Sequence, residues 1–139
     1  MQNTLTIQGP SKGRIIGAWV VQGLLAAVFL AVGGAKLAGV PMMVQIFDQI
    51  GFGQGFRIVT GVVEVLGAVA LLVPGFAALG AAWLAATMFF AVLTHLLILP
   101  GNPVPALVLL ALNVLVVWLR RDQLASMVAM FRRAMSRQR

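Results

Sequence analysis

Long apolar runs, separated by short breaks, dominate the chain. Four of them cover residues 15–37, 56–73, 76–99 and 104–119. A helix that crosses a bilayer needs about 20 mostly apolar residues, so the second and fourth runs are near the short limit and fit a compact bundle of slightly tilted helices. None of the runs has the apolar-polar alternation of a membrane β-barrel strand. We therefore predict an all-α integral membrane protein, built as a four-helix bundle.

Proline and glycine mark the breaks between the later runs. Pro74 and Gly75 separate the second run from the third, and residues 100–105 separate the third from the fourth. Such residues favour tight turns, so consecutive spans are expected to run up, down, up and down.

A longer connection follows the first run. Within it Pro41 suits a first helical turn, and Met43, Phe47 and Ile50 recur at helical spacing. We predict a short amphipathic helix here, lying at the outer membrane interface.

The C-terminal stretch, residues 120–139, combines apolar and basic positions. One helical face carries the apolar residues and the arginines lie elsewhere; the apolar positions are Leu124, Met127, Val128, Phe131 and Met135. This pattern is typical of a helix that lies on a membrane, and we expect it on the anionic inner leaflet. A partly disordered basic tail is the alternative.

Composition supports the bilayer as the solvent of this chain. Hydrophobic residues make up 61% of it and charged residues only 9%, against about a quarter in soluble proteins. The absence of cysteine excludes a disulfide, a thiolate nucleophile or a cysteine-ligated metal within the chain. The net charge of +7 does not indicate a nucleic-acid partner, because no soluble domain is predicted to carry a nucleic-acid-binding surface.

The basic residues instead indicate topology. Eight of them flank the four runs: Lys12, Arg14, Arg120, Arg121, Arg132, Arg133, Arg137 and Arg139. By the positive-inside rule both termini are cytoplasmic, in a bacterial inner membrane. The first run is too long for the core of a signal peptide and is expected to be an uncleaved anchor. The expected organisation is a cytoplasmic segment 1–14, a membrane domain 15–119 and a basic cytoplasmic tail 120–139.

Four polar residues, one on each span, are expected to approach one another in the outer half of the bundle. Helical side chains tilt toward the N-terminus of their helix, which directs Lys36 and His95 inward and Glu64 outward, with Asn113 at a similar level. An unpaired carboxylate in the membrane is costly, so Glu64 is either paired or protonated. Lys36 is its first candidate partner and His95 its second.

The other polar residues each have a structural and a functional interpretation. Arg57 lies two helical turns from Glu64 and is expected to extend toward the outer headgroups, as an anchor or as part of a site. His95 is a packing residue or a proton carrier, while Asn113 and Gln22 suit hydrogen bonds between helices. A single histidine, with Met88 on the same span, does not provide a haem site, and no metal or intrinsic cofactor is expected.

Three stretches, FLAVGGAKLAGVPMMVQIF, GFGQGFRIVTGVVEVLGAVALLVPG and LAATMFFAVLTH, carry a family resemblance. Over about residues 24–118 the chain resembles the DoxX-like family of small four-helix membrane proteins. The matching positions are Gly34, Lys36, Arg57, Gly61, Glu64, Leu71, Leu72, Pro74, Met88 and His95. The resemblance implies the four-helix fold and a polar site at these positions. Founding members of the family are associated with a membrane thiosulfate:quinone oxidoreductase, and others with oxidative-stress assemblies or with membrane-protein assembly.

Two functional hypotheses follow. In the first, a quinone-like or lipid-like molecule binds at the outer polar cluster, and the protein is a membrane subunit of a redox complex. The candidates for ligand binding or proton relay are Lys36, Arg57, Glu64, Met88, His95 and Asn113. In the second, the cluster only stabilises the bundle of a structural or assembly protein. A small transporter is less favoured, because no internal repeat is evident. Alanines spaced four apart in residues 78–86 suit packing within the bundle or a homo-oligomer.

Overall fold

Six α-helices make up almost all of residues 9–137, the part of the chain that the computed structural model describes. They are α1 (Lys12–Ala38), α2 (Pro41–Ile50), α3 (Gln54–Leu72), α4 (Ala77–Leu97), α5 (Val104–Leu119) and α6 (Arg121–Ser136). No strand occurs within this range, so the prediction of an all-α protein is confirmed. Residues 1–8 of the expected N-terminal segment and residues 138–139 of the tail lie outside it.

The helices begin and end at residues suited to those positions. The side chain of Ser11 accepts a hydrogen bond from the backbone N–H of Arg14 at 3.3 Å and so caps α1. Gly39 ends α1 with a φ of 69°, a left-handed conformation that glycine adopts freely. Pro41 begins α2, where its missing N–H leaves no helical bond unmade. Pro74 follows the end of α3 and cannot extend its hydrogen-bond ladder.

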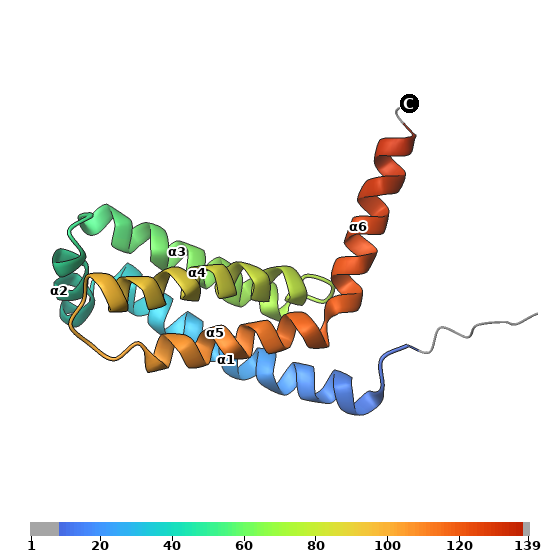
Figure 1. Cartoon of the computed structure of the whole chain (residues 1–139), viewed down its shortest axis with the longest axis horizontal. Coiled ribbons are helices and arrows are strands. Elements are labelled where there is room, and N and C mark those ends of the chain that lie inside the picture. Colours follow the sequence, from blue (N-terminus) through green and yellow to red (C-terminus); the bar gives the residue numbers. More distant parts are fainter. Residues whose placement is uncertain (1–8, 138–139) are drawn as a thin grey trace, which may run out of the picture.

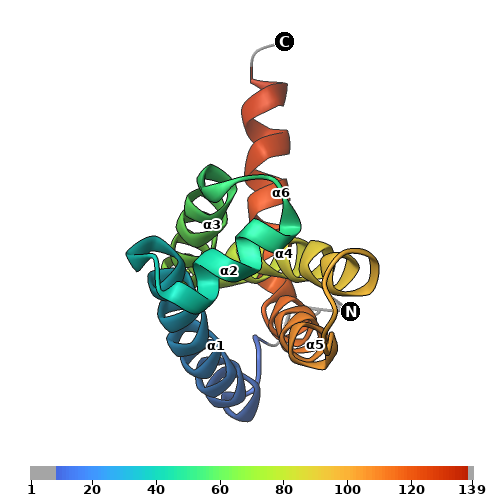
Figure 2. The same cartoon turned by 90° about the vertical axis from the view of Figure 1, so that its left-hand side faces the viewer.

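Helices α1, α3, α4 and α5 lie side by side as a bundle (Figure 1). Contacts join α1 to α3, α3 to α4, α4 to α5 and α5 to α1, so these helices surround a shared core. Helix α2 lies across one end of the bundle, as the end-on view in Figure 2 shows. Helix α6 leaves the opposite end, bent by 62° from α5. The short helix and the projecting helix therefore occupy opposite ends of the molecule.

The bundle has an apolar outside as well as an apolar core. Phe29, Leu71 and Leu84 are almost completely buried among the four helices. Many large apolar side chains point outward and are exposed, including Trp83 and Phe90. Extended apolar surface of this kind is unusual on a protein dissolved in water, but it is readily covered by lipid chains. The outer surface of the bundle is therefore suited to a membrane.

Three helices within residues 9–137, namely α1, α3 and α4, are long and apolar enough to cross a membrane. Helix α5 has 16 residues and reaches about 24 Å at 1.5 Å per residue, less than the roughly 30 Å of a hydrocarbon core. It meets the same criterion only together with α6, as a bent pair. The described chain thus has three candidate spans, or four if that pair counts as one span.

Small residues determine how closely α3 and α4 pack. A Cβ atom on Gly80 would lie 2.8 Å from the Cβ of Ala70 and 3.0 Å from the carbonyl oxygen of Gly67. A Cβ on Gly67 would lie 2.6 Å from the side chain of Leu84. Among the alanines of α4, Ala81 is fully buried within the bundle. Close contact between these two helices therefore depends on residues with little or no side chain.

Candidate functional site

An ion pair between Lys36 on α1 and Glu64 on α3 forms the centre of the candidate site. The Lys36 Nζ lies 2.5 Å from Oε1 and 2.6 Å from Oε2 of Glu64. The Glu64 side chain is 3% exposed and that of Lys36 is 12% exposed. Of the two partners that the sequence suggested for Glu64, Lys36 is the one in contact. Opposite charges at this distance offset each other, which allows both to reside in an apolar environment.

The pair forms beside a close approach of the α1 and α3 backbones. A Cβ atom on Gly33 would lie 3.1 Å from the carbonyl oxygen of Gly61 and 3.2 Å from the Cβ of Glu64. A Cβ on Gly61 would in turn lie 3.1 Å from the carbonyl oxygen of Gly33. These two glycines bring the backbones together, so Lys36, one turn beyond Gly33, reaches Glu64.

Arg57, near the start of α3, turns back onto the end of α1. Its Nη1 donates a hydrogen bond to the carbonyl oxygen of Lys36, and its Nε donates to Oε1 of Gln54 at 2.5 Å. The guanidinium also packs against Gly39, where a Cβ would lie 3.5 Å from Nη1. The sequence predicts that Arg57 extends toward the headgroups, whereas in the structure it caps the end of α1 by donating to the Lys36 carbonyl, which also accepts from the backbone N–H of Gly39.

Gln54 connects this cap to α2 and was not identified from the sequence. Its Nε2 donates to the carbonyl oxygen of Val44 at 3.0 Å and to Oδ1 of Asp48 at 2.6 Å. Since its oxygen accepts from Arg57, the side chain links the beginning of α3 to both α1 and α2. This linkage holds α2 across the end of the bundle.

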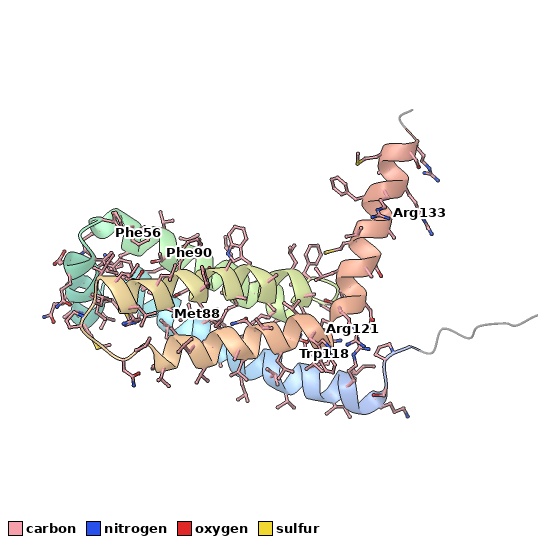
Figure 3. The ribbon with its side chains drawn as sticks, viewed as in Figure 1. Phe56, Met88, Phe90, Trp118, Arg121 and Arg133 are labelled. Atoms are coloured by element: carbon pink, nitrogen blue, oxygen red, sulfur yellow. The ribbon has the colours of Figure 1, made fainter. Side chains whose placement is uncertain are left out.

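A cavity of about 680 Å³, which we call the α2 cavity, lies between α1, α2, α3 and α4. Its wall is mainly apolar and includes Phe47 on α2, Phe56 on α3 and Phe90 on α4. Figure 3 shows Phe56, Met88 and Phe90 in the half of the bundle that is nearer α2. The polar residues that line the cavity are Lys36, Thr60, Glu64, Thr87, Thr94 and His95. The ion pair therefore forms part of the wall of the mainly apolar α2 cavity.

His95, in the last turn of α4, lines the same cavity. Its Nδ1 is buried and has no hydrogen-bond partner among residues 9–137. Gly101, in the connection from α4 to α5, lies beside the ring, and a Cβ there would be 3.5 Å from Nδ1. A buried nitrogen without a partner is costly unless something else bonds to it. His95 is thus the polar group of the cavity whose bonding capacity is least used.

Met88 and Asn113 differ in their relation to the cavity. Met88 is buried and lines it. Asn113 is fully buried outside the cavity lining, and its Nδ2 donates to the carbonyl oxygen of Leu109 on its own helix at 2.8 Å. The expectation that Asn113 bonds to a neighbouring helix is therefore wrong for this amide. Its Oδ1 has no partner among residues 9–137.

The arrangement suits binding of an uncharged polar group more than coordination of a metal. Within residues 9–137, no three His, Asp or Glu side chains gather into a group that could hold a metal ion. Lys36 has three N–H donors, and its two contacts with Glu64 leave one free for an acceptor in the cavity. His95 adds a nitrogen that donates or accepts according to its tautomer.

A second polar cluster lies at the α6 end of the bundle and was not predicted as a unit. Gln22 donates to the carbonyl oxygen of Leu71 at 2.6 Å and accepts from Nε of Arg120 at 2.7 Å. The hydrogen bond between helices expected for Gln22 is thus present. The Arg120 guanidinium also lies 5.3 Å from the ring centre of Trp19. Burial, together with the nearby charge of Arg14, lowers the pKa of Arg120 from its ordinary value.

Backbone groups at two further helix ends have hydrogen-bond partners in this second cluster. Nε of Arg14 donates to the carbonyl oxygen of Leu119 at 2.8 Å, at the end of α5. Oε1 of Gln123 accepts from the backbone N–H of Ala78 at 3.0 Å, in the first turn of α4. Arg14 also forms an ion pair with Asp122. Because terminal backbone groups have no partner within their own helix, these contacts both satisfy them and attach α6 to α1 and α4.

An all-helical chain with an apolar exterior and three or four candidate spans is a membrane protein of the multi-span helical class. The sequence model of the DoxX-like family matches residues 20–120, which include Lys36, Glu64 and His95. The chain belongs to the DoxX-like family, and the resemblance seen in its sequence is confirmed. Neither the curated proteins nor the solved structures contain a match to it.

Proposed function

We propose that this DoxX-like protein binds a quinone-like or lipid-like molecule in the α2 cavity. The observation that carries the proposal is the meeting of Lys36, Glu64 and His95 in one mainly apolar cavity of about 680 Å³. Small-molecule sites commonly have volumes of about 300–1,000 Å³ and combine apolar walls with a few polar groups. The apolar body of the ligand lies against the phenylalanines, and its polar head faces the ion pair.

The hydrogen-bonding capacity of the site favours a carbonyl or hydroxyl head. The charges of Lys36 and Glu64 already offset each other, so a charged head would leave a net charge within the bundle. A neutral oxygen, in contrast, accepts a hydrogen bond from the remaining N–H of Lys36 or bonds to a ring nitrogen of His95. A quinone or the ester region of a lipid presents such oxygens on an apolar body.

The role that we propose in a redox complex is docking or anchoring. The chain contains no cysteine, so it provides no thiol that could exchange electrons with the ligand. Electrons would pass between the bound quinone and a partner subunit, while Lys36, Glu64 and His95 orient the ring and exchange protons with its oxygens.

The membrane placement that we propose has four spans in a bacterial inner membrane. Helices α1, α3, α4 and α5 cross in alternating directions, α2 lies at the outer interface, and both termini are cytoplasmic. The charge distribution supports this orientation, because eight of the ten basic residues flank the membrane domain. The α2 cavity then lies in the outer half of the bilayer.

A structural or assembly role is the second candidate, and a specific observation favours it. The Lys36–Glu64 pair and the Arg57 cap are internally satisfied, so they can hold α1 against α3 without any ligand. In that case the cavity is filled nonspecifically by lipid chains, and partner proteins or further copies of the chain dock on the outer surface.

Extraction in a polymer that retains native lipids, followed by mass spectrometry, tests the proposal. We expect one hydrophobic molecule per chain, lost in Val63→Phe, which fills the cavity, and retained in Val62→Phe. Val63 lines the cavity, whereas its neighbour Val62 is exposed, so the two variants add the same bulk on different faces. Equal mixed-lipid content in all three proteins would favour the structural role.

A further inference from the structure

Helix α6 carries an apolar face that no other part of the described chain covers. None of its residues is buried. On this face the side chains of Val128, Phe131 and Met135 are 53%, 73% and 61% exposed. On a helix these positions fall close together, because successive residues turn by about 100°. A face of this size in contact with water would be unfavourable, so it is suited to an apolar partner.

The opposite side of α6 is basic. Arg133 is two residues from Phe131, and therefore lies on nearly the opposite side of the helix. Figure 3 shows Arg133 on the side of α6 that faces away from the bundle. The acid of this helix, Asp122, is already paired with Arg14. Arg132 and Arg133 thus have no acidic partner on α6. Their positive charge is complementary to an anionic surface.

Aromatic residues mark the level at which α6 begins. Trp19 and Trp118 are both exposed. The guanidinium of Arg120 lies 5.3 Å from the ring centre of Trp19, and that of Arg121 lies 4.9 Å from the ring centre of Trp118. Exposed tryptophans beside arginines are typical of the boundary between acyl chains and headgroups. Since α6 starts at Arg121, it starts at this boundary.

The direction of α6 is set by the bundle. Its axis is bent by 62° from α5, so it runs closer to the membrane plane than to the membrane normal when α5 crosses the bilayer. The contacts of Asp122 with Arg14 and of Gln123 with Ala78 fix its first turn to α1 and α4. The helix is thus held beside the headgroups by contacts with two other helices.

From these observations we infer that α6 is a surface helix that rests on an anionic leaflet. Its Val128–Phe131–Met135 face enters the boundary with the acyl chains, and its arginines contact lipid phosphates. The occupant of this face is the membrane itself, in the leaflet next to Trp118. This inference is independent of the ligand in the α2 cavity.

Single spin labels on the full chain test it, because the chain has no cysteine of its own. Ser126→Cys and Val128→Cys are matched positions, since they leave the charge unchanged and lie on nearly opposite sides of α6. The labelled protein is reconstituted in bilayers of phosphatidylcholine with phosphatidylglycerol, and collisions with oxygen and with a water-soluble nickel chelate are measured. We expect the label at 128 to favour oxygen and the label at 126 to favour nickel.

The contribution of the arginines to membrane binding of α6 is tested by adding Arg132→Gln and Arg133→Gln to the Val128→Cys protein. In the anionic bilayer, each removed arginine should lower the ratio of membrane-bound to free α6 about fivefold, and pure phosphatidylcholine should have a similar effect on the unmodified helix. Equal nickel access at 126 and 128 in anionic bilayers would overturn the inference. A second result would also overturn it, namely a label at 128 that neither reagent reaches and that couples magnetically to other labels. If dilution with unlabelled chain removes that coupling, the occupant of the face is a second copy of the chain.

Discussion

Gly33 on α1 and Gly61 on α3 face each other so closely that a Cβ on either would lie 3.1 Å from the other's carbonyl oxygen. The Lys36–Glu64 pair is formed within one turn of this contact, and Glu64 is 2% exposed there. The geometry of the candidate site therefore depends on two residues that have no functional group of their own.

Gly33→Ala should destabilise the protein by about 1–3 kcal/mol, because the added methyl group forces the two helices apart. Gly34→Ala is the matched control, since a Cβ at Gly34 meets no atom within 4 Å. Alanine is also favoured over glycine in a helix, so the control should be neutral or slightly stabilising. Thermal unfolding in detergent measures both changes, and equal stability of the two variants would contradict the close-contact argument.

Glu64→Gln should destabilise the bundle by roughly 3–5 kcal/mol, because the ammonium of Lys36 loses its counter-charge in an apolar environment. Movement of the Lys36 side chain toward the headgroups would reduce this cost. The double change Lys36→Met with Glu64→Gln should cost less than the sum of the single changes. Unfolding of all four proteins gives the coupling energy, and strictly additive effects would mean that the two residues do not interact directly.

Arg57→Leu should loosen the end of α1 and the attachment of α2, because the carbonyl of Lys36 and the side chain of Gln54 both lose a charged donor. Hydrogen bonds to charged groups contribute about 1.5–3 kcal/mol. Hydrogen exchange should accelerate in residues 39–53 more than elsewhere. Arg132→Leu removes the same charge from the exposed face of α6 and should leave that region unchanged; if both variants behave alike, the cap has no specific role.

His95→Leu should weaken ligand binding but should not destabilise the protein without ligand. Loss of a hydrogen bond to a bound head group would weaken binding by about tenfold, which corresponds to roughly 1.4 kcal/mol. The empty protein should be as stable or more stable, because the unpartnered Nδ1 is replaced by an apolar group. Titration with a soluble short-chain quinone and unfolding in detergent measure the two effects. Unchanged affinity in the variant would remove His95 from the site.

The proposed orientation predicts opposite accessibility of the two ends of the bundle. In the cysteine-free chain, Gln49→Cys on α2 should react with a membrane-impermeant maleimide in intact cells, and Ser136→Cys on α6 should react only after the cells are opened. The excess of basic residues at the α6 end is the physical reason. Reaction of Ser136→Cys in intact cells would reverse the orientation.

The sequence alone determined the parts of this protein that depend on local chemistry. Apolar runs set where helices form, and proline or glycine set where they stop, as at Gly39 and Pro74. The tilt of helical side chains and the cost of an unpaired carboxylate in an apolar environment made Lys36 the first candidate partner of Glu64, ahead of His95, and the structure shows the contact with Lys36. These inferences succeed because they need only the direction of two helices and the spacing of residues along each.

The tertiary structure decided which side chains meet at the helix ends and where a cavity forms. Arg57 turns back to the carbonyl of Lys36 because the start of α3 lies beside the end of α1. Asn113 lies outside the α2 cavity because no residue of α5 lines that cavity. The contact between Gln22 and Arg120 joins residues 98 positions apart, and the cavity itself exists only because α2 lies across the bundle. Such features depend on distances between segments, and those distances are set by packing of the whole bundle.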